Sequence, residues 1–123
     1  MKIFKSGKWQ GKVNFVDDEN TVIGYDTLQD CCEYAGYFIS DKKENETKED
    51  EFKADFEPYK IDCDFFEEVT DCRELDEGGM VRFRLFADEK PDLFLHLFNC
   101  HNGYYGCGFT VQHSGIVVKS ETL

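Results

Sequence analysis

The strongest constraint on the fold is a period-two alternation of apolar and polar residues in the last third of the chain. In residues 80–86 the side chains of Val81, Phe83 and Leu85 alternate with two arginines, which is typical of a β-strand with one buried face. Residues 92–98 are apolar on both faces, as in a central strand. Asn102-Gly103 is a strong hairpin signal, and it predicts a return strand over 107–112.

The first third of the chain predicts a hairpin followed by a helix. Residues 11–16 and 21–25 are short β-like runs on either side of a polar turn. Asp26 or Thr27 would then cap a helix over 28–35 that ends at Gly36. We therefore expect one α+β domain over residues 1–123. It would have a largely antiparallel sheet of about five to seven strands and at least one covering helix.

Cysteines and histidines suggest a candidate metal site. A hairpin at Asn102-Gly103 would place Cys100 and Cys107 on one face, with His101 at the turn. Cys31 and Cys32 on the predicted helix could complete a structural zinc site, because thiolate and imidazole are zinc ligands. The alternative is that the cysteines are free, small core residues. The six cysteines include no Cys-x-x-Cys pair.

The net charge of −12 is concentrated in the middle of the chain. Residues 41–77 hold 16 acidic residues against six basic ones, and 41–57 reads as an acidic loop or a short helix. A segment this acidic repels nucleic-acid phosphates and suits a basic protein surface; the alternative is a solvated, solubilising face. The candidate partner-binding residues are Glu44, Glu46, Glu49, Asp50, Glu51, Phe52, Asp55, Phe56, Glu57, Asp62, Asp64, Glu67 and Glu68.

Other residue patterns argue against an enzyme and against a membrane protein. A Cys/His pair could serve a small hydrolase, but no nucleophile elbow, phosphate loop or HExxH motif is present. We expect His96, within a strand of Leu and Phe, to be a hydrogen-bonded core residue, and Arg82 and Arg84 to be an exposed pair. No apolar run approaches the ~20 residues that span a bilayer, so we expect a cytoplasmic protein.

Two stretches resemble a known group of sequences. Residues 22–26 with 29–33 (VIGYD and QDCCE), and residues 99–105 with 108–109 (NCHNGYY and GF), are similar to a family of small uncharacterised proteins from bacteria and their phages. The resemblance covers roughly the first forty and the last forty-five residues and brings no activity with it. It implies a fold in which the two motifs meet.

A phage origin would make an inhibitor of host defence the leading hypothesis, by analogy with anti-CRISPR proteins of similar size and charge. The chain would act in the host cytoplasm through its acidic segment. It would occupy a basic, nucleic-acid-binding surface of a host protein such as a CRISPR-associated nuclease, without itself binding nucleic acid or membrane. The rival hypothesis is a zinc-stabilised scaffold with no inhibitory role. The sequence leaves a homodimer open.

Overall fold

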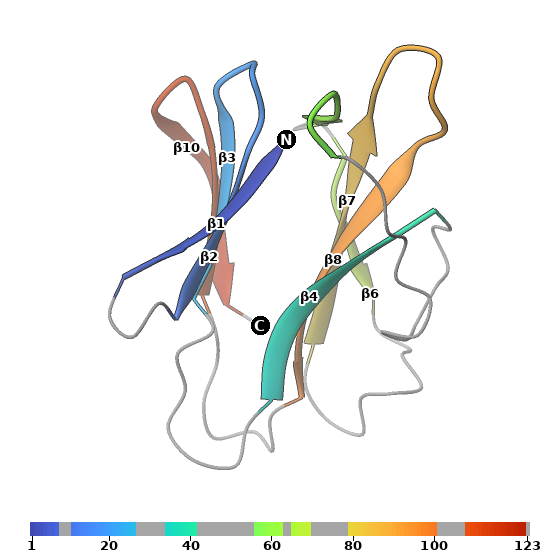
Figure 1. Cartoon of the computed structure of the whole chain (residues 1–123). Coiled ribbons are helices and arrows are strands. Elements are labelled where there is room, and N and C mark those ends of the chain that lie inside the picture. Colours follow the sequence, from blue (N-terminus) through green and yellow to red (C-terminus); the bar gives the residue numbers. More distant parts are fainter. Residues whose placement is uncertain are drawn as a thin grey trace.

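The fold consists of two antiparallel β-sheets that face each other (Figure 1). The computed structural model describes residues 1–7, 11–26, 34–41, 56–62, 65–69, 79–100 and 108–122. Within these ranges every regular element is a strand. The α+β prediction with a covering helix is therefore wrong, and the described part of the chain is an all-β fold.

The first sheet has the strand order β1-β2-β3-β9-β10. Its neighbours pair antiparallel throughout, so that β1 and β10 form its two edges. The strands are β1 (Lys2–Ser6), β2 (Lys12–Val16), β3 (Thr21–Asp26), β9 (Gly108–His113) and β10 (Ile116–Thr122).

The second sheet has the order β4-β8-β7, and two short strands, β5 and β6, pair in turn along the other edge of β7. Strand β8 is therefore flanked on both sides, by β4 and β7, as its run of apolar residues predicted. The strands are β4 (Tyr34–Ser40), β5 (Lys60–Ile61), β6 (Glu67–Val69), β7 (Gly79–Phe86) and β8 (Leu93–Cys100).

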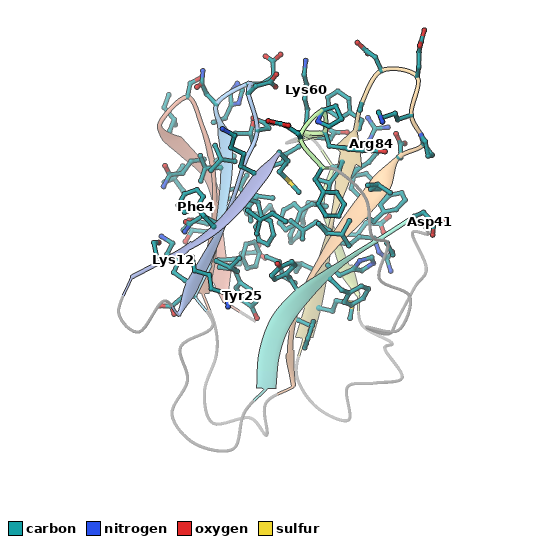
Figure 2. The ribbon with its side chains drawn as sticks, viewed as in Figure 1. Phe4, Lys12, Tyr25, Asp41, Lys60 and Arg84 are labelled. Atoms are coloured by element: carbon teal, nitrogen blue, oxygen red, sulfur yellow. The ribbon has the colours of Figure 1, made fainter. Side chains whose placement is uncertain are left out.

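The core lies between the two sheets and is built from alternate residues of their facing strands. The first sheet contributes Phe15, Ile23 and Phe109, and the second contributes Phe83 and Leu95, all at most 2% exposed. Other core members include Ile39 of β4 and, on the same strands as the first five, Val13, Tyr25, Val81, Leu85, Leu93, Leu97 and Val111. The hydroxyl of Tyr25, a residue that Figure 2 labels between the sheets, donates to the carbonyl of Phe98 across the interface at 2.7 Å.

Local turn chemistry explains both hairpins of the first sheet. Asn20 has a φ of 64° and is the last of the four loop residues, 17–20, that close the predicted hairpin between β2 and β3. Between β9 and β10, Ser114 and Gly115 have φ of 52° and 81°. Two consecutive positive φ values form the tight turn whose twist matches that of its strands.

Two local predictions fail, and both failures involve distant pairings. The predicted helix over 28–35 lies mostly outside the described residues, but Tyr34 and Ala35 belong to β4, which pairs with β8. The hairpin predicted at Asn102-Gly103 is also wrong. Strand β8 pairs with β4 and β7 in the second sheet, whereas β9 pairs with β3 and β10 in the first. The intervening segment therefore connects the two sheets.

Candidate interaction surface

One end of the sandwich brings together four loops that are far apart in the sequence (Figure 1). We call this surface the loop end; it comprises residues 17–20, 56–59, 87–92 and 114–115. Hydrogen bonds join these segments. The amide of Ser114 donates to the carbonyl of Asn20 at 2.9 Å, and the hydroxyl of Tyr59 donates to the carbonyl of Pro91 at 2.9 Å. The four loops therefore form one continuous surface.

Asp17 is the buried anchor of the loop end. Its Oδ1 accepts hydrogen bonds from the amides of Glu19 and Thr21, at 3.0 and 2.9 Å. Its Oδ2 accepts from the amide of Ile61 in β5, at 2.8 Å. One carboxylate thereby closes a loop of the first sheet and ties it to the second. Only 7% of Asp17 is exposed, so this acidic side chain is structural.

The amino terminus is held at the same end. The α-ammonium group of Met1 donates to the carbonyls of Phe56, Glu57 and Tyr59 at 2.6, 2.9 and 2.8 Å. Three carbonyl oxygens satisfy all three N–H groups of this cation. A hollow of about 410 Å³ opens beside it. Its lining residues are Met1, Lys2, Val16, Asp17, Asp18 and Glu57.

Carboxylates of two loops converge on Lys60, which Figure 2 labels at the loop end. The Lys60 ammonium contacts Glu19 Oε1 at 2.9 Å. This hydrogen bond and the charge of Glu19 raise the pKa of Lys60, and the charges of Asp18 and Asp88 raise it further. These residues come from the loops on either side of Lys60. The Lys60 ammonium thus pairs with Glu19 and feels the charges of two further carboxylates.

The remaining ionic contacts of this end centre on Arg84. Its guanidinium lies 3.0 Å from Asp62 and 3.4 Å from Asp92, and it also stands over the ring of Phe86. The loop between β7 and β8 adds Glu89, whose φ is 59°. Burial raises the pKa of the neighbouring Tyr59 hydroxyl, and the charge of Asp92 adds to this effect. Asp62 and Asp92 therefore both pair with Arg84 of the same chain.

A buried polar row crosses the outer face of the second sheet. Strand register aligns Phe38, His96, Arg82 and Glu67 on β4, β8, β7 and β6. Arg82 Nη1 donates to Glu67 Oε2 at 2.9 Å, and Arg82 Nε donates to His96 Nε2 at 3.1 Å. The His96 ring stacks on Phe38 with centroids 4.2 Å apart. Because Nε2 accepts, the imidazole is neutral with its proton on Nδ1.

This row confirms one sequence prediction and corrects another. His96 is fully buried and hydrogen-bonded, as expected. Arg82 was expected to be exposed, but it is only 7% exposed because Glu67 and His96 take up its donors. Arg84, two residues further along the same face, has a side chain 37% exposed. The alternation therefore predicts correctly that the two arginines lie on the same face of the sheet, but it does not predict how exposed each side chain is.

Apolar side chains are exposed at both edges of the first sheet. In β10, Ile116, Val117 and Val118 are 69%, 53% and 54% exposed. In β1, Phe4 is 50% exposed (labelled in Figure 2). The start of β10 follows the turn that is hydrogen-bonded to Asn20, so its apolar residues adjoin the acidic loop end.

Few of the predicted partner-binding residues lie in the described part of the chain, and those that do have different roles. Phe56 packs against the core, and Glu57 is exposed beside the amino terminus. Asp62 and Glu67 bind Arg84 and Arg82. For Glu68 only the backbone, within β6, is described. The others lie outside the described residues: Glu44, Glu46, Glu49, Asp50, Glu51, Phe52, Asp55 and Asp64.

The predicted zinc ligands lie almost entirely outside the described ranges. Cys100 ends β8, opposite Tyr34, whereas Cys31, Cys32, His101 and Cys107 fall on residues that the structure does not describe. Among the described residues, no three His, Cys, Asp or Glu side chains come together as a metal site. Zinc binding therefore stays a prediction.

Sequence reasoning missed the residues that define the loop end. Asp18, Glu19, Asp88 and Glu89 lie at hairpin tips, in segments whose summed charge is small. The sequence feature that could have identified them is their place in turns between strands. Alternate turns of an antiparallel sheet lie at the same end, so acidic residues in those turns come together. The exposed Ile116–Val118 run was read only as a strand.

Comparisons with known proteins yield no relative for this chain. No family model, curated protein or solved structure matches it. The described residues also contain no helix that is long and apolar enough to cross a membrane.

Proposed function

We propose that this protein is a binding protein whose acidic loop end engages a positively charged surface of another protein. The observation that carries the proposal is the 2.9 Å ion pair between Lys60 and the exposed Glu19 at the loop end. The charges of Asp18, in the same loop, and of Asp88, in the β7–β8 loop, act on the same ammonium. Carboxylates held on a rigid sandwich give a directed field, which accelerates encounter with a cationic partner. The net charge of −12 adds a long-range component.

The proposed surface differs from the one predicted from the sequence. Of the residues predicted there, Asp62 and Glu67 are bound by arginines, and their side chains are only 21% and 32% exposed. The side chain of Glu19, although paired with Lys60, is 60% exposed and can still meet a partner. Glu57 belongs to both surfaces, since it lines the hollow beside Asp18. The interaction is therefore assigned to loop tips of the sandwich, and the acidic residues of 41–55 add to the net charge of the chain.

The partner class that we propose is a nucleic-acid-binding protein of a host cell, such as a CRISPR-associated nuclease. A groove built for phosphates presents clustered Lys and Arg, and an acidic protein can occupy it in competition with nucleic acid. The net charge of −12 supports this class. In this role the protein would act as an inhibitor without catalytic residues.

A capture experiment with matched variants tests the proposal. Asp18→Asn with Asp88→Asn removes two charges around Lys60. Asp26→Asn with Glu121→Gln removes two charges at the opposite end of the first sheet, where β3 ends and Glu121 is aligned with Phe109. Each protein is used to capture partners from a host lysate at 50 mM and 300 mM salt.

We expect the loop-end variant to reduce capture of a specific partner about tenfold, the effect of losing two ion pairs of ~0.7 kcal/mol each. The opposite-end variant keeps capture, and high salt weakens it for all proteins. Equal loss in both double variants, or capture that salt does not change, would contradict a role for the loop end.

A further inference from the structure

The edge of β10 combines two features that suit an added strand. Among the described strands it pairs only with β9, so its outer edge presents backbone donors and acceptors. Ile116, Val117 and Val118 are all more than half exposed. A register shift between Val117 and Lys119 makes Val118 the extra residue of a bulge, and Val118 lines the pocket described next.

A small aromatic pocket opens beside this edge. Phe65, Phe66 and Phe83 line it together with Val111, Val118 and Lys119. Lys119 Nζ stands 3.8 Å from the Phe66 ring centroid, over the ring face. The pocket volume of about 70 Å³ is roughly half that of an engineered cavity that binds benzene, which suits a small aliphatic side chain.

The charges near the edge of β10 indicate which kind of strand could bind there. The turn that leads into Ile116 is hydrogen-bonded to the loop that carries Asp18 and Glu19. A second copy would bring another chain of net charge −12 to this edge, which like-charge repulsion disfavours. A segment that carries Lys or Arg meets carboxylates instead.

We propose that β10 is a docking edge for an extended, basic segment of a partner protein. The segment adds a strand to the first sheet, with aliphatic residues at alternate positions and cationic residues between them. One aliphatic side chain enters the pocket between Phe66 and Val118. Its cationic residues face Asp18 and Glu19. This inference rests on the proposed function and assigns the partner's binding segment.

The test uses a defined probe, the blocked peptide acetyl-Lys-Val-Lys-Val-Lys-Val-Lys-amide, and its counterpart with Glu in place of Lys. Amide NMR shifts of the ¹⁵N-labelled protein follow each titration. Val118→Asp places a charge at the pocket. The matched control is Phe4→Asp, which alters a similarly exposed residue on the other edge of the same sheet.

We expect the basic peptide to shift amides of residues 116–122, and the acidic peptide to shift none. Val118→Asp should weaken binding at least fivefold and Phe4→Asp less than twofold. The inference is overturned by shifts at β1 in place of β10, by no binding, or by equal binding to Val118→Asp. A concentration-dependent dimer that Val118→Asp abolishes would also overturn it, because the occupant would then be a second copy.

The two proposals can fail separately. If the loop-end double variant loses its partner but Val118→Asp captures it normally, the edge inference fails and the proposed function stands. If the loop-end variant captures normally while the peptide still binds at β10, the acidic surface is rejected and the docking edge is kept.

Discussion

Asn in place of Asp17 provides a sharp test of how the loop end is held together. The carboxylate accepts one hydrogen bond at Oδ2 from Ile61 and two at Oδ1 from its own loop. Asparagine retains one acceptor oxygen, which can serve the loop amides, but its NH₂ group would face the Ile61 N–H. The substitution therefore loses a charge-assisted hydrogen bond and leaves a buried donor unsatisfied.

A hydrogen bond to a charged group contributes about 1.5–3 kcal/mol, and an unsatisfied buried donor costs about 1–3 kcal/mol. These effects overlap, so Asp17→Asn should lower the free energy of unfolding by about 2–3 kcal/mol. For a chain of this length the melting temperature falls by roughly 10 °C. Urea unfolding followed by circular dichroism gives the free energy directly.

The matched control is Asp18→Asn, since Asp18 is the next residue and is exposed. An exposed substitution without buried partners should change stability by less than about 0.5 kcal/mol. If Asp17→Asn proves as mild as Asp18→Asn, the link between the two sheets through this carboxylate is refuted.

Three further substitutions probe the fold. Burial raises the pKa of Tyr59, so the contribution of its hydroxyl to stability is complete below about pH 10 and is lost above it. In urea unfolding, the difference in free energy of unfolding between the natural chain and Tyr59→Phe should shrink as the pH rises through this range. A difference that stays constant would contradict this reasoning. Arg82→Met removes the donor to buried His96 and the cation of the partly exposed Glu67, and should cost about 1–3 kcal/mol, against less than ~1 kcal/mol for Arg84→Met. Equal costs would refute the buried row. Tyr25→Phe loses the bond between the sheets and should cost about 1–2 kcal/mol in thermal unfolding, whereas no change would argue against that bond.

Local sequence signals predicted the parts of the fold that local chemistry determines. The β2–β3 hairpin follows from a polar turn between two β-like runs, and the alternation of residues 80–86 identified the core face of β7. The central position of β8 also follows from its apolar faces. Each of these depends on residues within about ten positions of one another.

The remaining errors come from pairings between distant segments. Tyr34–Ser40 forms a strand because it pairs with β8 some sixty residues later, and no periodicity within the segment reveals that partner. The Asn102-Gly103 signal cannot distinguish a hairpin from a connection between sheets. Similarly, Arg82 and Arg84 alternate identically in sequence, yet only Arg82 meets His96 and Glu67.

The candidate surface was predictable only in kind. The composition indicates an acidic chain, and the net charge per segment is most negative in residues 41–77. That charge count does not reveal the acidic residues at the turn tips, because only the topology brings those turns to one end. Asp17 reads as an ordinary turn residue in the sequence. Its buried role depends on Ile61, a residue of the other sheet.

The central claim is that a cationic partner binds the carboxylates around Lys60. The most direct measurement is the dissociation constant of the complex between 50 and 300 mM salt, for the natural chain and for the two double variants described above. The account predicts a steep weakening with salt and a shallower slope only for the variant at Asp18 and Asp88. A slope that is flat, or unchanged in that variant, would contradict it.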